Sequence, residues 1–168
     1  DMLFAAIDMC PVFGGTLESV DESKLEGLKG IDSVVKLDNA VAVVADTYWR
    51  ARKGLSALSI TYDEGDDNEF NSDDVDRMLT EHIDDEAPTT FSCGDVDDAL
   101  EEADKVIEAQ YDVPFITHAT LEPMNCTASV TDERCEVWVP TQTQEWTEDR
   151  LASVTGHFRS NIHIHTTL

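Results

Sequence analysis

The sequence predicts an α+β protein in which two ordered regions flank an acidic linker. Residues 1–62 alternate apolar, strand-like runs with short helical stretches. Acidic side chains crowd residues 63–104, where Arg77 is the only strong base. Beyond Pro88, apolar alternation returns in a pattern typical of strands, a hairpin and a helix. A length of 168 residues with 41% hydrophobic residues is sufficient for a packed core.

In the first region we expect one central strand and one helix as the main packing elements. Residues 40–45 are apolar at every position, as in a strand that is covered on both faces. Asp46 or Thr47 is a suitable N-cap for a helix over residues 48–58. Shorter elements are expected around this pair: strands at 2–9, 16–20, 31–37 and 59–62, and a helical turn at 23–28.

The acidic stretch predicts a surface linker with one short helix. Residues 72–82 have helical spacing, and Val75, Met78 and Leu79 form a weak apolar side. So many carboxylates also raise the alternative of a calcium-binding EF-hand. The spacing of acidic residues and glycine that an EF-hand loop requires is missing, which argues against that alternative.

In the second region, Asp95 is expected to cap a helix that extends through Ala103. A strand is expected over residues 105–113, followed by an extended piece at 116–121. The chain then predicts a hairpin with its turn at residues 132–133, a helix over 144–154 that ends at Gly156, and a last strand from Asn161.

The hairpin decides whether Cys126 and Cys135 can form a disulfide. A two-residue turn places Val130 opposite Cys135 and Ala128 opposite Val137, which gathers the small and apolar side chains on one face. The two sulfurs then lie about 13 Å apart along the strands, too far for a disulfide. We therefore expect all four cysteines to be reduced core residues, and none of them has zinc-site spacing.

The charge of the chain excludes several classes of partner. The formal net charge is -25, with 36 acidic residues against 11 Lys and Arg. Such a surface repels phosphate backbones and anionic lipid, so we expect neither nucleic-acid binding nor membrane binding. No apolar run approaches the roughly 20 residues that a membrane helix needs, so we expect no membrane insertion either.

Few residue patterns indicate chemistry by themselves. His163 and His165 share one face of a strand and could hold a metal, but no third ligand lies nearby in the sequence, so we expect no metal site. His118 and Glu122 bracket an extended turn before Pro123 and could act as acid and base or form a structural hydrogen bond. The three tryptophans are expected to be core or interface anchors.

Several segments together resemble the large subunit of the xanthine dehydrogenase and aldehyde oxidase family. Residues 42–47 (AVVADT), the helix after them and residues 59–64 (SITYDE) are similar to the α/β hammerhead domain of that family. Residues 93–104 (CGDVDDALEEAD) resemble the segment that follows the hammerhead. The start of the family's molybdopterin-binding region resembles residues 118–128 (HATLEPMNCTA) and 136–142 (EVWVPTQ). The sequence of these segments is most similar to the isoquinoline 1-oxidoreductase branch.

The resemblance implies a domain organisation and a set of expectations. It implies an α/β hammerhead-like domain at 1–65, an acidic linker at 66–88, and the first, incomplete lobe of a molybdopterin-binding domain at 89–168. The parent subunit is expected to bind molybdopterin, to hydroxylate an N-heterocycle or an aldehyde with oxygen from water, and to pass electrons to a small subunit with two [2Fe–2S] clusters. His118 and Glu122 are the candidate residues of its substrate funnel.

Two departures from the family pattern limit these expectations. The xanthine dehydrogenase branch has a glutamine two positions before the histidine that matches His118, and this chain has Ile116 there, which argues against purine substrates. The family's glycine-rich cofactor loop and catalytic glutamate have no counterpart in the chain. Both ends also have the character of strands entered mid-course, so we expect an interior fragment that has no catalytic residue and binds no cofactor alone. The alternative is a free-standing, non-catalytic hammerhead-type module that holds a partner on an acidic face.

Overall fold

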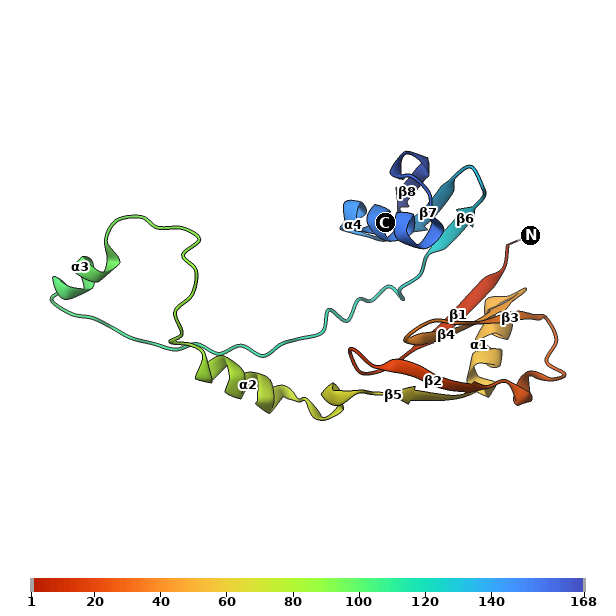
Figure 1. Ribbon diagram of the computed structural model, residues 1–168, viewed down its shortest axis with the longest axis horizontal. Coiled ribbons are helices and arrows are strands. Elements are labelled where there is room, and N and C mark those ends of the chain that lie inside the picture. The colour runs from red at the N-terminus through yellow and green to blue at the C-terminus, as the bar shows by residue number, and fades with distance from the viewer. Residues whose placement is uncertain (1, 168) are drawn as a thin grey trace. The chain divides into compact units, whose positions relative to one another are not determined.

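The computed structural model describes residues 2–167, so Asp1 and Leu168, the outer limits of the expected domains, lie outside the described residues. By its internal contacts the chain divides into two units, Asp1–Gly94 and Asp95–Leu168 (Figure 1). This division falls a few residues beyond the linker expected at 66–88. Helices and strands are mixed throughout both units, which confirms the α+β class.

A three-stranded antiparallel sheet forms the centre of the first unit. Its order is β1-β4-β3, with bounds Phe4–Met9, Ala40–Ala45 and Ile31–Lys36. The central position of β4 confirms the prediction from its uninterrupted apolar run. Val41 and Val43 of this strand are fully buried. Phe4 of β1 and Ile31 of β3 both pair with Ala45, and the register of β3 shifts between Ile31 and Ser33.

Helix α1 (Tyr48–Ala57) packs directly on this sheet. The side chain of Thr47 accepts a hydrogen bond from the amide of Arg50, so Thr47 is the N-cap, one of the two residues expected. Gly54 makes the close approach possible, because a Cβ there would lie 2.9 Å from both Ile31 Cδ1 and Val43 Cγ1. The result is a small core in which Ala6, Ala45 and Ala51 are buried and Ile31 and Leu55 pack at its edge.

A two-stranded antiparallel sheet completes the strands of the first unit. It consists of β2 (Thr16–Asp21) and β5 (Ser59–Asp63), with an irregularity between Leu17 and Ser19. The Tyr62 hydroxyl of β5 donates a hydrogen bond to Asp8 Oδ2 of β1 over 3.0 Å, which joins the two sheets. Short 3-10 turns η1 (Ser23–Leu25) and η2 (Asp66–Glu69) and helix α2 (Ser72–Glu81) make up the rest.

The second unit begins with helix α3 (Val96–Glu101), which Asp95 caps as expected by accepting a hydrogen bond from the Asp98 amide. Residues 105–126 then form neither helix nor strand and are exposed along their whole length. The strand expected at 105–113 is therefore wrong. A strand is stabilised by a neighbour that completes its ladder of hydrogen bonds, and in the described part of the chain no strand runs beside this segment.

A three-stranded sheet and helix α4 form the ordered core of the second unit. The strand order is β6-β7-β8, with bounds Thr127–Val130, Cys135–Val139 and Ile162–Thr166. β6 and β7 are antiparallel, whereas β8 is parallel to β7. The pairs Val130–Cys135 and Ala128–Val137 confirm the predicted hairpin register.

Helix α4 (Gln144–Thr155) covers one face of this sheet. Leu151 and Ala152 of α4 pack against a buried cluster formed by Cys135, Val137 and Ile162. Gly156 ends the helix in a left-handed conformation with φ of 74°, as its place in the sequence indicated. The short turn η3 (Arg159–Asn161) then leads into β8.

The cysteines and the hydropathy of the chain agree with this architecture only in part. All four cysteines are free, as expected, but only Cys135 is buried, and Cys93 and Cys126 are exposed rather than in a core. Cys93 and Cys126 lie in irregular chain, which explains why neither is covered.

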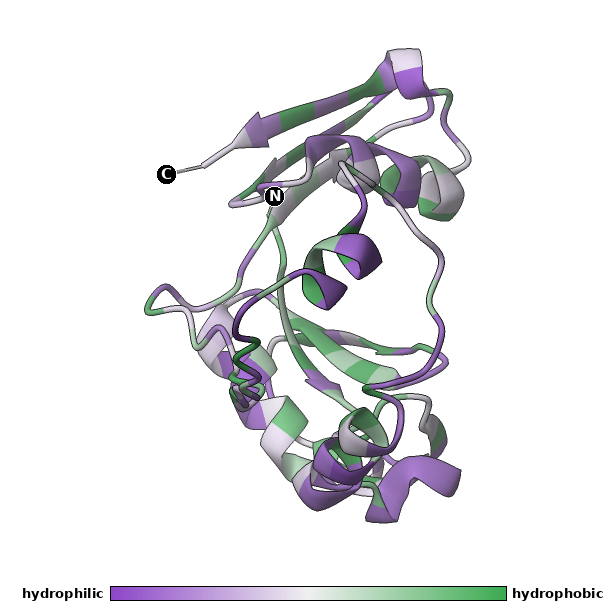
Figure 2. Ribbon diagram, turned by 90° about the vertical axis from the view of Figure 1, so that its left-hand side faces the viewer, coloured by the Kyte–Doolittle hydropathy of each residue, from purple (hydrophilic) through white to green (hydrophobic). Residues whose placement is uncertain are grey.

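Apolar residues concentrate on the strands and form separate patches on the helices (Figure 2). No helix in residues 2–167 is long and apolar enough to cross a membrane.

Candidate functional site

The two candidate site residues, His118 and Glu122, both lie in the exposed segment 105–126 of the second unit. Several large apolar side chains of this segment are almost fully exposed, among them Tyr111, Phe115 and Leu121. Ala119, directly after His118, has a φ of 40°, a backbone conformation that residues other than glycine rarely adopt. The backbone then bends at Leu121 and at Glu122 itself.

A set of local hydrogen bonds holds Glu122 in a turn. The Asn125 side-chain amide donates to Glu122 Oε1 over 3.3 Å and to the Pro123 carbonyl oxygen over 2.9 Å. The Thr120 hydroxyl donates to the Glu122 carbonyl oxygen over 3.2 Å. One carboxylate oxygen of Glu122 thus has a fixed neighbour, and the other oxygen is left free to accept from a ligand.

The structure does not bring His118 and Glu122 into direct contact. Within residues 2–167 neither a hydrogen bond nor an ion pair joins the two side chains. Glu122 has Asn125 as its partner instead. An acid and base pair would have to be completed by a substrate that lies between them or by a change in the chain. Their shared role in a substrate funnel stays a prediction.

The His165 ring packs against neighbouring side chains of the three-stranded sheet, and His163 is exposed. The His165 ring stacks on Trp138 with a centroid distance of 4.8 Å and an interplanar angle of 14°. His165 Nε2 also lies 3.6 Å from Glu136 Oε1, and Glu136 in turn accepts from Arg134 over 2.5 Å. Across residues 2–167, no three His, Cys, Asp or Glu side chains gather as a metal centre would require.

The three tryptophans were all expected to be core or interface anchors, but their exposure differs. Trp138 is half-buried and stacks on His165, so it is an anchor of the sheet. Trp49 and Trp146 are each about three-quarters exposed, with values of 75% and 73%. They lie on helices α1 and α4, where an exposed indole is available to a partner rather than to the core.

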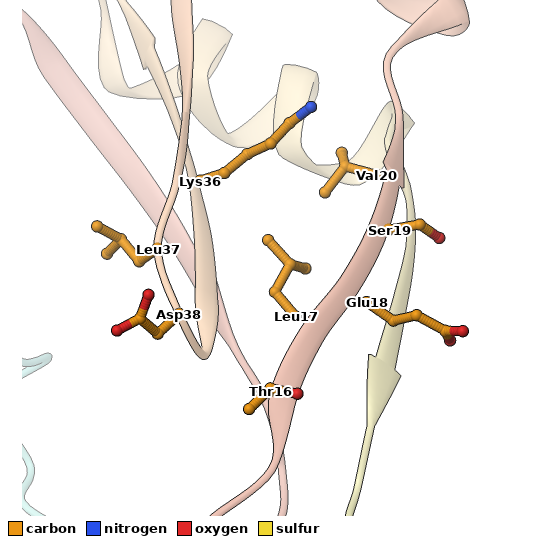
Figure 3. Close-up of a pocket in the computed structure, with 8 residues that line it drawn as sticks. All are labelled: Thr16, Leu17, Glu18, Ser19, Val20, Lys36, Leu37 and Asp38. Atoms are coloured by element: carbon orange, nitrogen blue, oxygen red, sulfur yellow. The ribbon is translucent and has the colours of Figure 1, made fainter.

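The sequence did not indicate a groove that the structure shows in the first unit. It lies between β2 and the connection from β3 to β4 and has a volume of about 840 Å³ (Figure 3). Leu17, Val20 and Leu37 supply its apolar lining. Lys36, also in the lining, is paired with Glu22 over 2.7 Å. The groove is open and lined by ordinary strand residues, so no motif could have marked it. A smaller cavity of about 200 Å³ lies beside Trp49 on α1.

The two cavities of the first unit are not lined by the candidate residues, which lie in the second unit. Both cavities are lined by residues of the first unit before Ala57. In the second unit, residues 105–126 are exposed throughout and enclose nothing. Every buried side-chain polar atom in residues 2–167 has a hydrogen-bond partner, so the burial pattern does not indicate a binding site for a cofactor phosphate or pterin.

Comparison with protein families decides the family of the chain. A family model described as the molybdopterin cofactor-binding domain matches residues 79–168, which is more than half of the chain. The chain belongs to this family. The match begins within α2, earlier than the start at residue 89 expected for the molybdopterin-binding part. It includes both candidate residues, His118 and Glu122.

Two curated relatives agree with this membership of the molybdopterin cofactor-binding domain family. The chain is 26% identical over 153 residues to a membrane-bound aldehyde dehydrogenase [pyrroloquinoline-quinone] of Gluconacetobacter polyoxogenes, with 85% of this chain and 20% of that protein covered. It is 27% identical over 139 residues to a nicotinate dehydrogenase subunit of Pseudomonas putida, with 83% of this chain and 12% of that protein covered. The chain thus spans a fifth or less of the length of these relatives.

Solved structures support the fold. The Cu,Mo-CO dehydrogenase matches with a TM-score of 0.62 at 16% identity, over 97% of this chain and 27% of that chain. Quinoline 2-oxidoreductase from Pseudomonas putida 86 matches with a TM-score of 0.63 at 13% identity, over 96% of this chain and 26% of that chain. The expected resemblance to the molybdopterin-binding subunits of the xanthine dehydrogenase family is confirmed.

Proposed function

We propose that this chain is an interior part of the large subunit of a molybdenum hydroxylase and is inactive by itself. The observation that carries the proposal is the family match over residues 79–168. Supporting it, the chain aligns with 12% and 20% of two curated relatives, which leaves most of a related subunit outside the chain.

The proposed reaction of the whole subunit is oxidative hydroxylation with water as the oxygen source. Molybdopterin would supply the metal centre on which this chemistry depends. We assign no step at the metal centre to this chain, and the one group of the chain that we propose to act on the substrate is the positioned carboxylate of Glu122. In this proposal the chain contributes framework, and the turn at Glu122 contributes one free carboxylate oxygen to the wall of the substrate funnel.

We propose an N-heterocycle or an aldehyde as the substrate class. The names of the relatives and neighbours include nicotinate, quinoline and aldehyde. Ile116 stands where the purine-hydroxylating branch has a glutamine, so an apolar side chain replaces a hydrogen-bonding one near the expected funnel. A heteroaromatic ring or an aldehyde gains from apolar contact there, whereas a purine would lose a hydrogen-bond partner.

The proposed partner is a small subunit with two [2Fe–2S] clusters that takes the electrons away. The relative from Pseudomonas putida is itself named as one subunit of nicotinate dehydrogenase, so it acts within an assembly of several chains. In this proposal the clusters lie on the partner.

The test is a comparison of the isolated 168-residue chain with the complete subunit, each purified after expression in a host that makes the cofactor. Molybdenum per chain is measured by mass spectrometry, and turnover by dye reduction with nicotinate, quinoline and an aldehyde. We expect the complete subunit to contain molybdenum and to turn over at least one of these substrates, and the isolated chain to do neither. Stoichiometric molybdenum in the isolated chain, or a complete subunit without molybdenum, would refute the proposal.

A further inference from the structure

Glu122 is restrained by two residues that follow it closely in the sequence. Its backbone is limited by Pro123, because a residue before proline is largely confined to extended conformations. Its side chain is limited by Asn125, whose amide nitrogen donates to Glu122 Oε1 over 3.3 Å. An exposed glutamate otherwise samples many side-chain rotamers. The direction in which the Glu122 carboxylate points therefore depends on Asn125.

The Asn125 amide is itself fixed by a second acceptor. The same nitrogen donates to the Pro123 carbonyl oxygen over 2.9 Å. A carboxylate and a carbonyl oxygen only accept hydrogen bonds, so the opposite orientation of the amide would place its oxygen against two acceptors. Both N–H groups of Asn125 are thus used in one orientation. This orientation holds Glu122 Oε1 in place, whereas Oε2 has no partner among the described residues.

These hydrogen bonds form without help from any other part of the molecule. Donor and acceptors all lie within residues 122–125, and the bonds are present although the segment is exposed along its whole length. Asparagine suits this place, because its short side chain reaches groups two or three residues away. A neighbour that covers the turn would strengthen the bonds, since water then competes less for the same donors and acceptors.

We propose that Asn125 is a positioning residue of the substrate funnel and affects the reaction only through the direction of the Glu122 carboxylate. This inference rests on the proposed function, in which that carboxylate acts on the substrate. A group that takes part in proton transfer must lie within hydrogen-bond reach of the atom it serves. Displacing such a group by about 1 Å lowers the rate by on the order of 10²-fold.

The test compares four variants of the complete subunit: Asn125→Ala, Glu122→Gln, the double variant of both, and a control. The control is Gln110→Ala, because the Gln110 amide donates to Asp112 Oδ1 over 3.0 Å, which is the same kind of bond in the same exposed segment. For each variant kcat and KM are measured per bound molybdenum, together with the thermal midpoint.

We expect Asn125→Ala to lower kcat by about 10–100-fold with little change in KM, because the lost interaction serves the transition state. Gln110→Ala should keep a kcat close to that of the wild type. In the Glu122→Gln background, Asn125→Ala should lower kcat by a further factor of no more than about three, since no carboxylate remains to be positioned. A residue that only stabilises the turn would not show this dependence on Glu122.

A second measurement uses the isolated 168-residue chain and does not depend on activity or on the folding of a variant subunit. Nuclear magnetic resonance of the isotope-labelled chain detects the two side-chain amide protons of Asn125. We expect Glu122→Gln to keep their hydrogen-bonded chemical shifts, because an amide oxygen also accepts. Glu122→Ala should move them to the values of a free asparagine amide.

Several results would overturn the inference. Equal losses of kcat from Asn125→Ala in the wild-type and Glu122→Gln backgrounds would mean that Asn125 does not act through Glu122. Equal losses in Asn125→Ala and Gln110→Ala would mean that any loosening of the segment lowers the rate. Unchanged Asn125 amide signals in Glu122→Ala would mean that the bond does not form. A normal kcat in Asn125→Ala alone would refute this inference only, whereas a normal kcat in Glu122→Gln as well would also refute the role of Glu122 in the proposed function.

Discussion

The sheet of the first unit and the segment 105–126 of the second unit use apolar residues in opposite ways. In β4 of the first unit, Val41 and Val43 are completely covered by neighbouring strands and by α1. In the second unit, Tyr111, Val113 and Phe115 alternate as in a strand but are between 82% and 90% exposed. Two sequence patterns that both predict a strand therefore have different outcomes, depending on whether the described chain supplies a neighbouring strand. The sheet of the first unit is stabilised by contacts within the described chain, whereas the apolar side chains of residues 105–126 have no such contacts.

The largest effect expected from this difference is on catalysis. We expect Glu122→Gln in the complete subunit to lower turnover per bound molybdenum by about 10²–10⁴-fold, because the change keeps the shape and removes a positioned carboxylate. The thermal midpoint should stay close to that of the wild type, since Glu122 is exposed and its one side-chain partner, Asn125, can also bond to an amide oxygen. A lowered midpoint with normal turnover would assign Glu122 a structural role in the turn.

A large effect on stability is expected in the first unit. Val43→Ala removes two methyl groups from a fully buried position against Gly54 of α1 and should cost about 2 kcal/mol of unfolding free energy. The matched control is Phe115→Ala, which removes a larger side chain that is 82% exposed and should change stability by no more than about 0.5 kcal/mol. Urea unfolding of the chain measures both. Similar losses in the two variants would mean that the two regions do not differ in this way.

A smaller effect is expected on the pH dependence of the stability of the first unit, through the hydrogen bond that joins its two sheets. Burial, with the hydrogen bond to Asp8, raises the pKa of Tyr62 from 10.0 to about 12. Above pH 10 the unfolded chain releases this proton while the folded chain keeps it, so the contribution to stability is complete below pH 10 and disappears as the pH rises to about 12. Absorbance titration should show one tyrosine that ionises late, and Tyr62→Phe should remove it. If Tyr111→Phe removes it instead, the assignment is wrong.

The smallest effect is expected at the end of α4 in the second unit. Gly156 has a φ of 74°, and a Cβ there would meet no atom within 4 Å. Gly156→Ala should therefore cost about 1 kcal/mol from backbone conformation alone, without a steric clash. Thermal unfolding of the chain, with Gly156→Asn as a control that tolerates this conformation better, measures the difference. Equal midpoints for the alanine and wild-type chains would show that the cap contributes little to this unit.

Sequence reasoning was most successful where local chemistry determines the structure. The apolar run at residues 40–45 identified the central strand, and Thr47 was one of two expected caps of α1. The two-residue turn at 132–133 fixed the hairpin register, because a strand side chain has only two faces to choose between. The family was also recognisable from short motifs whose order matches, although each motif is modest by itself.

The features that sequence reasoning missed depend on contacts between distant residues. Residues 105–113 have the alternation of a strand, but alternation does not reveal whether a neighbouring strand exists. The groove beside Leu17 and Leu37 arises where two separate strand segments diverge, and no local pattern encodes that geometry. Cys93 and Cys126 were expected in a core because neither a disulfide nor a zinc site fitted the sequence, yet both lie in irregular, exposed chain.

Amide hydrogen exchange of the isolated chain distinguishes a self-sufficient region from one that lacks its neighbours. Residues 105–126 make none of the backbone–backbone hydrogen bonds of the described chain, whereas residues 40–45 are paired on both sides. We expect amides of residues 40–45 to exchange only through global unfolding, and those of 105–126 to exchange at the rate of an unprotected chain. Protection of 105–126 comparable to that of 40–45 would contradict this expectation, because it would mean that the isolated chain alone supplies the missing neighbours.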